Sequence, residues 1–478
     1  MKDFMKKIHL LATMKLCLLF SAGMLMAACD DTYDGKDRYE SSVKNATLES
    51  PTEITITQSS DGSSMTIEWP VVYGAGGYEF KLINANGGEE LVSKTIDGCK
   101  VTASCEEDML YRISVRTLGN TNLNNTEAAT ALVKEYSTFT ETYAKIEPCD
   151  LYEYFQNNPI SEDATEELNF DLMPGGQYTL SQPLNLNFKK VVLRSSDKAN
   201  HANIAIAKDA YFELTNDFSL KYINLDCSQT ETPILMMYKY ADEAEVAPYL
   251  EKPKNYYLIN FLRLIGCDFR SVIGSLYYDN NLAYAVVNFV VKNTLIEMNT
   301  TTDKVKFESF ISCQGGGVKD FSIVNSTVYQ KGTGNSKYFL RYNNSCRVDR
   351  LGWTTSDHTT LTYTNCTFYK VASGLWANYS GISNYSIYDL QNNIWYDCAD
   401  GQIARRMMGN GRLGNNCSFN SVNNTYWHNG APADQGNYDT SNTQLQTDPA
   451  FEAPEADDFT PTGAQQVEYR TGDTRWYE

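Results

Sequence analysis

Phe289-Val-Val-Lys-Asn293-Thr-Leu-Ile296 is the stretch that decides the fold of the second half of this chain. It contains an alternating apolar run, then Asn, a small residue, one variable position and a large apolar residue. Because Asn and Gly both tolerate the left-handed backbone conformation, we predict a one-residue bend between two short strands. Further copies centre on Asn325, Asn365, Asn392 and Asn423, and an earlier copy has Gly266 at the same place.

The repeat predicts a solenoid of stacked coils. Successive bend positions lie roughly 27 to 40 residues apart, which is the usual size of a structural repeat. The apolar residues before each bend alternate with a period of two, which favours strands and excludes an α-solenoid. Stacking would align the Asn side chains in a ladder in which each amide bonds to the next. The large residue three places after each bend should return to the interior: Phe269, Ile296, Val328, Phe368 and Trp395.

The pattern resembles the right-handed parallel β-helix of pectate lyases, a pectin lyase-like solenoid. We expect it to span residues 148–478, and the opening Gly175-Gly-Gln-Tyr-Thr-Leu180 is similar to the start of many such helices. The phrases Thr447-Asp-Pro-Ala-Phe451 and Gly472-Asp-Thr-Arg-Trp476 resemble the closing segments of surface lipoproteins of gut Bacteroidetes. Those proteins are grouped under the domains of unknown function DUF4957 and DUF5123. The resemblance therefore implies no established activity.

An all-β domain is expected ahead of the solenoid, at residues 49–140. Alternating strands are separated by turn residues, and Trp69, Tyr78 and Tyr111 fall at intervals that resemble a fibronectin type III sandwich. We interpret Trp69 and Tyr111 as core residues. The whole chain is thus predicted to be all-β, with a sandwich followed by a parallel β-helix.

The N-terminus predicts export. Basic residues precede an apolar run from Leu16 to Ala28, and Cys29 follows small residues, so residues 1–28 are interpreted as a signal peptide. A membrane-spanning helix is the alternative, but the run is short for one. Cys29 resembles the lipidated Cys of bacterial lipoproteins, and residues 29–48 form an acidic tether. In Bacteroidetes this arrangement implies a lipid-anchored protein on the outer-membrane surface, and partners there would include glycan-uptake proteins.

Charge and cysteine usage narrow the partners further. The net charge of −19 argues against nucleic acid as a partner. No Cys lies at a metal-binding spacing, and no metal site is predicted. Cys267 and Cys366 follow directly after a bend and are expected to be small buried residues. Whether Cys99 and Cys105 form a disulfide is left open by the sequence.

The sequence gives only weak evidence for catalytic residues. A calcium-dependent lyase needs several Asp around Ca²⁺ and an Arg or Lys as base, and glycoside hydrolysis needs paired carboxylates. The only candidates are Asp397 and Asp400 near Arg405 and Arg406, with Asp268 near Arg270 as a second set. Neither set matches a lyase signature, and a solvated charge cluster explains both. No cofactor is therefore expected, and Ca²⁺ would enter only with lyase activity.

Aromatic residues give a stronger indication of function. Four aromatic residues do not lie at the alternating positions that are expected to face the core, and they fall in predicted loops: Trp353, Trp376, Tyr379 and Tyr385. Aromatic rings pack on the C–H faces of sugars, and stacked coils would present them along a groove. The alternative is that Tyr is simply a favourable strand residue. The leading hypothesis is a surface lipoprotein that binds polysaccharide, with pectic polymers foremost, without cleaving it. A lyase acting on uronate-containing glycan and a structural or adhesive surface protein are the alternatives.

Overall fold

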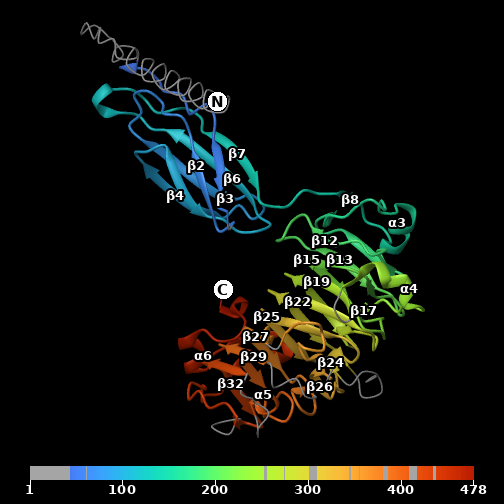
Figure 1. Cartoon of the computed structure of the whole chain (residues 1–478). Coiled ribbons are helices and arrows are strands. Elements are labelled where there is room, and N and C mark those ends of the chain that lie inside the picture. Colours follow the sequence, from blue (N-terminus) through green and yellow to red (C-terminus); the bar gives the residue numbers. More distant parts are fainter. Residues whose placement is uncertain are drawn as a thin grey trace, which may run out of the picture. The chain divides into compact units, whose positions relative to one another are not determined.

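A computed structural model of the chain is shown in Figure 1. It describes residues 43–477 except 61, 252–255, 274, 301–308, 344–345, 355, 380–385, 409–416 and 434–437. The chain divides into two compact units, Met1–Thr138 and Phe139–Glu478. The predicted signal peptide and Cys29 lie outside the described residues. Within the described part, no helix is both long and apolar enough to cross a membrane.

The first unit contains two antiparallel sheets, as expected for a sandwich. Its core is a cluster of side chains from both sheets, in which Trp69 lies between Tyr78, edge-on at 5.6 Å, and Phe80, stacked at 5.8 Å. Trp69 and Tyr111 are both buried, so their assignment to the core is confirmed. One sheet has three strands, β1 (Thr55–Gln58), β2 (Ser64–Glu68) and β5 (Lys100–Ser104); the other has four, β4 (Glu90–Ile96), β3 (Tyr78–Asn84), β6 (Leu110–Thr117) and β7 (Leu132–Ser137).

The second unit is a right-handed parallel β-helix, as predicted, built from three rows of strands (Figure 1). The first row contains β9 (Leu168–Leu172), β12 (Val191–Ser195), β15 (Phe218–Lys221), β19 (Tyr256–Ile265), β22 (Tyr284–Lys292), β25 (Gly317–Gln330), β27 (Thr359–Tyr369), β29 (Ser386–Gln391) and β31 (Ser418–Val422). The second row contains β10 (Gln177–Leu180), β13 (Ala202–Ile206), β16 (Ile223–Asp226), β20 (Asp268–Val272), β23 (Leu295–Met298), the distal halves of β25 and β27, β30 (Ile394–Tyr396) and β32 (Thr425–His428). The third row is a separate parallel sheet: β11 (Leu184–Asn185), β14 (Phe212–Leu214), β17 (Leu235–Met237), β21 (Tyr277–Tyr278), β24 (Ser309–Cys313), β26 (Tyr338–Tyr342) and β28 (Ala377–Tyr379).

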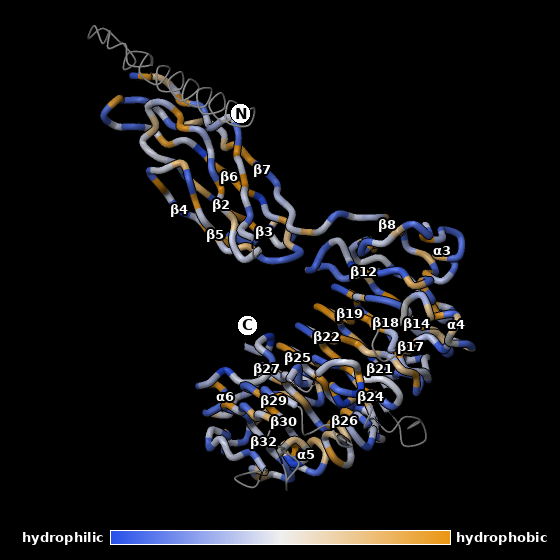
Figure 2. Tube along the Cα trace, in the orientation of Figure 1, coloured by the Kyte–Doolittle hydropathy of each residue, from blue (hydrophilic) through white to orange (hydrophobic). Residues whose placement is uncertain are grey.

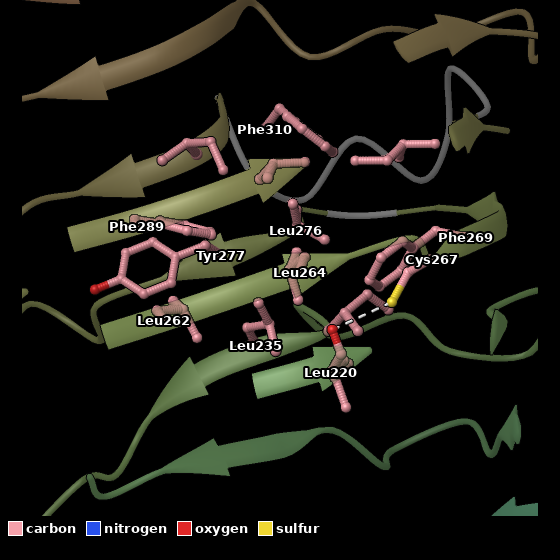
Figure 3. Packing of buried hydrophobic residues seen from close by; sticks show 14 of the residues in the cluster. Leu220, Leu235, Leu262, Leu264, Cys267, Phe269, Leu276, Tyr277, Phe289 and Phe310 are labelled. Carbon is pink, nitrogen blue, oxygen red and sulfur yellow. Dashed lines mark hydrogen bonds between the residues drawn. The ribbon is translucent and has the colours of Figure 1, made fainter. Parts of the chain in front are cut away.

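Hydrophobic side chains from all three rows fill the interior of the coils. Figure 2 shows hydrophobic residues along the strands of this unit, and Figure 3 shows how Leu264, Phe269 and Tyr277 meet inside it. Toward the C-terminal coils the interior becomes a stack of rings, because Trp395 lies parallel to Phe368 at 5.4 Å and to Tyr426 at 5.3 Å. All five large residues expected to return to the interior after the bend are buried, which confirms that prediction: Phe269, Ile296, Val328, Phe368 and Trp395.

The bend between the first and second rows has the predicted left-handed backbone. Its φ angle is +61° at Gly266 and lies between +48° and +55° at Asn293, Asn325, Asn365, Asn392 and Asn423. Gly266 is required for a second reason, since a Cβ there would come within 2.7 Å of the Tyr222 ring. The predicted Asn ladder is confirmed only in part, because it is interrupted at Asn365. Asn325 donates to Asn293 at 2.9 Å and Asn423 donates to Asn392 at 3.3 Å, but Asn365 has a buried Oδ1 without a partner.

The more continuous polar ladder lies one residue later, inside the coil. Thr294 donates to the carbonyl of Leu264 at 3.3 Å, and Asn393 donates to that of Tyr363 at 2.8 Å. The Asn393 Oδ1 also accepts from the backbone N–H of Cys366 at 3.0 Å. These side chains satisfy backbone groups that a dry interior would otherwise leave unpaired. The residues of this inner ladder are fully buried: Cys267, Thr294, Ser326, Cys366, Asn393 and Asn424.

The cysteines that the structure describes are thiols. All ten cysteines in the described part of the chain are free, so Cys99 and Cys105 do not form a disulfide. Cys267 and Cys366 are buried, as predicted. Burial raises the pKa of Cys267 to about 12, and its Sγ donates to the carbonyl of Leu220 at 3.4 Å (Figure 3). A thiol with such a raised pKa is chemically inert and acts as a packing group.

Two segments cover parts of the β-helix. At the first coil, α3 (Leu151–Asn157) begins with an Asp150 cap and buries Leu151 and Phe155. The C-terminal segment contains β34 (Phe451–Ala453), β35 (Asp458–Pro461), α6 (Ala464–Tyr469) and η7 (Thr474–Tyr477). It folds back along the outside of the second row, where Phe459 packs on Tyr329 and Asp473 accepts from Thr327 at 2.8 Å.

Candidate binding face

The third row presents one outward-facing residue from each coil. Along these strands, inward residues such as Leu235 and Tyr277 belong to the core, and the residue that follows each of them points to the opposite face. The outward residues are in direct register from strand to strand. We call them the outer column: Asn185, Glu213, Met236, Tyr278, Ser312, Arg341 and Asn378.

Glu213 is the one carboxyl group of the outer column. It accepts a hydrogen bond from Asn185 Nδ2 at 2.9 Å. Burial raises its pKa, although the bond from Asn185 acts in the opposite direction. Hydrolysis of a glycosidic bond by the usual route requires a second carboxyl group facing it, and the outer column does not supply one.

The middle of the outer column combines an aromatic ring with polar groups. The Tyr278 hydroxyl accepts from Asn281 Nδ2 at 2.9 Å, and Ser312 accepts from Gln314 Nε2 at 3.1 Å. Arg341 follows on the next strand and is half-buried. Ser312 is 2% exposed, so the Tyr278 ring and the neighbouring polar groups, and not this hydroxyl, form the accessible surface here. A ring face, a guanidinium group and amide groups in one line are the groups that bind sugars.

The aromatic residues predicted as binding residues do not form one surface. Trp376 is 1% exposed and stacks on Phe339 at 4.2 Å, so its expected position outside the core is wrong. It lies directly before β28, where it turns inward and completes the ring stack. Trp353 is half-buried, with Lys319 Nζ 5.8 Å from its ring centroid. Tyr379 is the last residue of β28, and Tyr385 lies outside the described residues.

The charged candidates are also separated from one another. Arg405 begins the short helix α5 (Arg405–Met408), which includes Arg406 and packs against β28. Its guanidinium lies 3.4 Å from Asp400. Asp397 instead accepts from the backbone N–H of Asn429 at 2.8 Å, so it is engaged in a turn. Within the described residues, no three His, Cys, Asp or Glu side chains are grouped to hold a metal ion.

A cluster that the sequence revealed only in part, through Asp268 and Arg270, lies outside the second row. The Tyr329 hydroxyl accepts from Arg270 at 2.9 Å and donates to Glu297 at 3.0 Å. Lys331 donates to Asp457 of the C-terminal segment at 2.9 Å. Burial is the main reason that the pKa of Tyr329 is raised. These groups come from three coils and a distant segment, which only the tertiary structure brings together. Asp268 lies 3.5 Å from Arg270 in the same cluster.

Comparisons with known proteins show that two regions of the chain are similar to domains of unknown function. The family model DUF4992, a domain of unknown function, matches residues 5–175, and the model DUF4957 matches residues 176–331. The expected similarity to DUF4957 is therefore confirmed for that region. The first match extends past the boundary between the two units and into the first coils. No curated protein matches the chain.

Two solved structures of pectate lyases are similar. Pectate lyase PelI from Erwinia chrysanthemi, in complex with tetragalacturonic acid, has 10% identity and a TM-score of 0.17, over 67% of this chain and 84% of that one. Pectate lyase Pel3 from Pectobacterium carotovorum also has 10% identity and a TM-score of 0.17, over 84% of this chain and 97% of that one. At such TM-scores these similarities carry no argument about activity.

Proposed function

We propose that this protein binds an extended polysaccharide along the outer column and does not cleave it. The observation that carries the proposal is the register of the column, because seven coils place polar, charged and aromatic side chains in one line. Neighbouring strands are about 4.8 Å apart, which is close to the length of one sugar ring in an extended chain. Each coil can therefore meet about one sugar.

The side chains favour a glycan that carries carboxyl groups. Tyr278 supplies a ring face, and the guanidinium of Arg341 can donate two parallel bonds to a carboxylate. The net charge of −19 opposes an acidic polymer at long range. However, salt screens charges beyond about 8 Å at physiological ionic strength, so the groups in contact decide the preference. Pectic polymers are therefore the first ligands to test.

Binding without cleavage is supported by the composition of the outer column. Glu213 is its only carboxyl group, whereas the usual glycoside hydrolases use two. A lyase is the second candidate function, and one observation favours it: α5, which begins with Arg405, packs against the last strand of the third row. The ion pair with Asp400 opposes it, because a paired guanidinium is a poor base.

The N-terminal sequence supports a location for this protein at the cell surface. The signal peptide at residues 1–28 and a lipid on Cys29 would anchor the protein at the outer-membrane surface. There it would hold glycan for neighbouring uptake proteins. Labelling with a radioactive fatty acid, compared between the natural chain and Cys29→Ala, tests this part. We expect the label to be lost in the variant.

Affinity gel electrophoresis against pectic and neutral polysaccharides tests the binding. We expect a pectic polymer to retard the natural protein, and Tyr278→Ala and Arg341→Ala to migrate freely. Tyr469→Ala is the control, because Tyr469 is 46% exposed on α6, away from the outer column. Retardation by no polysaccharide would overturn the proposal. Release of unsaturated uronides, seen as ultraviolet absorbance and lost in Arg405→Ala, would establish the lyase instead.

A further inference from the structure

One end of the sandwich carries the two most exposed large hydrophobic side chains in the described part of the chain. Val71 is 75% exposed and Tyr73 is 61% exposed, and both lie in the loop between β2 and β3. The loop sequence, Pro70-Val-Val-Tyr-Gly-Ala-Gly-Gly77, contains no charged residue. Single hydrophobic residues are normal on a protein surface, but two that project from one uncharged loop indicate a contact surface.

Hydrogen bonds fix the backbone of this loop. The N–H of Val72, which lies between the two exposed residues, donates to the Tyr78 hydroxyl at 2.7 Å. Asn125 Nδ2 donates to the carbonyl of Gly74 at 2.9 Å. Because these bonds hold the loop on both sides of Tyr73, the exposed side chains form a preformed projection of the sandwich.

The chain enters the sandwich at the same end. In the segment 43–48, the N–H of Asn45 donates to the carbonyl of Leu123 at 3.1 Å, and the N–H of Leu48 donates to that of Thr126 at 3.0 Å. Both acceptors belong to the loop between β6 and β7. The first residues of the described structure are therefore fastened to this loop.

The two loops also touch each other. The N–H of Gly76 donates to the carbonyl of Leu118 at 2.9 Å. We call the three segments together the entry end: residues 43–48, 70–77 and 118–126. The chain leaves the sandwich at the opposite end, because the last residue of β7, Ser137, pairs with the first residue of β6, Leu110 (Figure 1).

The entry end is nearly uncharged, although the whole chain has a net charge of −19. Lys44 is the only charged residue of its three segments, and it is exposed. Behind the loops, Glu79 and Glu127 both pair with Arg116, at 2.7 and 2.8 Å. Asp97, in the turn after β4, adds one carboxyl group beside the first loop. Most of this surface can therefore lose water without the cost of desolvating an ionised carboxyl group.

We infer that the entry end rests on the lipid surface that holds Cys29, with Val71 and Tyr73 inserted among the lipid headgroups. The inference depends on the lipid proposed for Cys29 but not on the proposed glycan binding. Thirteen residues separate Cys29 from residue 43, and such a chain spans at most about 45 Å, so it keeps the entry end near the membrane. A Tyr ring suits the boundary between headgroups and acyl chains, and Lys44 can reach headgroup phosphates. The lipid anchors the protein, and the loop sets which end of the sandwich faces the membrane.

Tryptophan fluorescence of the lipidated protein in phosphatidylcholine vesicles tests the inference, with and without bromine on the acyl chains. Bromine quenches tryptophan only at short range. Val71→Trp places a probe in the loop, and the natural protein gives the background of its own six tryptophans. We expect brominated lipid to lower the added emission by about half or more, because interfacial segments reach about 5–10 Å into the boundary between headgroups and acyl chains. Leu91→Trp is the matched control, since Leu91 is 37% exposed on β4 at the opposite end of the same sandwich, and its emission should not change.

Variants at Tyr73 test the chemistry of the contact. In the Val71→Trp background, Tyr73→Phe should keep the quenching and Tyr73→Asp should abolish it, because a carboxylate is costly among lipids. Protein that carries the Cys29 lipid but shows no quenching at position 71 would overturn this inference alone, and an entry end that binds an envelope protein would give that result in vesicles of pure lipid. Equal quenching at positions 71 and 91 would also overturn it. If fatty-acid labelling finds no lipid on Cys29, the inference fails together with the proposed location, so the two failures are distinguishable.

Discussion

The inner ladder and the outer column follow the same repeat but obey different constraints. Residues of the inner ladder, such as Thr294 and Asn393, are small, buried and bonded to backbone carbonyls. Residues of the outer column vary from Glu213 to Met236 to Tyr278, although their backbones stack in equal register. Regular coils therefore restrict side-chain choice only where they close a dry interior. Function is free to occupy the other face.

The largest loss of stability is expected for a substitution that tests whether Trp376 belongs to the core. Trp376→Ala removes a ring that is 1% exposed and stacked on Phe339, so it should lower the free energy of unfolding by about 3–5 kcal/mol. Urea denaturation followed by circular dichroism measures it. Affinity for glycan should change little in the protein that remains folded. Normal stability with lost binding would return Trp376 to the binding surface.

Asn393→Ala tests the inner ladder itself. The substitution leaves the carbonyl of Tyr363 and the N–H of Cys366 without their side-chain partner inside the core. We expect a loss of about 2–4 kcal/mol, because each unsatisfied buried group costs about 1–3 kcal/mol. Asn365→Gly is the comparison: Gly accepts its φ of +51°, and its Oδ1 has no partner to lose. Equal losses in the two variants would contradict the distinction between bend and ladder.

A pH-dependent change in stability of intermediate size is expected from Asp279, which directly follows strand β21 of the third row. Asp279 follows Tyr278, and burial raises the pKa of its carboxyl to about 6 despite bonds from the backbone N–H groups of Gly315 and Gly316. The folded state therefore binds the proton more tightly than the unfolded chain. Stability attributable to Asp279 should fall as the pH rises from about 4 to about 6, by at most about 3 kcal/mol.

Thermal unfolding of Asp279→Asn across the same pH range measures this contribution. The difference in stability between the natural protein and the variant should change across the window and be constant above about pH 7. A difference that does not depend on pH would mean that the carboxyl keeps an ordinary pKa, because the backbone N–H groups of Asn281, Gln314, Gly315 and Gly316 then balance the effect of burial.

The smallest expected effect on stability is on the outer column. Tyr278→Ala removes a half-buried ring and should cost about 1 kcal/mol. Its neighbour Tyr277 is fully buried, and Tyr277→Ala should cost about 3–5 kcal/mol. Differential scanning fluorimetry on the two variants compares the faces of one strand. Similar melting temperatures would show that the outward face is packed as tightly as the core.

Much of the fold could be predicted because its signals are local. The exchange of Gly266 with Asn at the bend reports a backbone conformation, and alternation reports which side chains turn inward. The same signals mislead for Trp376, since a residue at the end of a turn can point either way, and here the ring stack determined its direction. The left-handed angle is a property of one residue, but the hydrogen bonds of a ladder depend on the neighbouring coil. The sequence therefore predicts the bends, but not the interruption at Asn365 or the inner ladder one residue later.

The candidate sites were much less predictable. The seven residues of the outer column share no sequence motif. Only the register of the third row aligns them. The ion pair between Lys370 and Glu455 joins residues that are 85 positions apart in the sequence. No spacing in the sequence reports such a contact.

The sequence by itself determined the strand period, the left-handed bends and the burial of the large residue after each bend. These depend on steric limits and on hydrophobicity over a few residues. The tertiary structure alone decided which outward residues share a column, where the polar ladder runs and which carboxylates meet Lys331 and Lys370. Such contacts depend on how coils and the C-terminal segment stack, and stacking joins residues that are far apart along the chain.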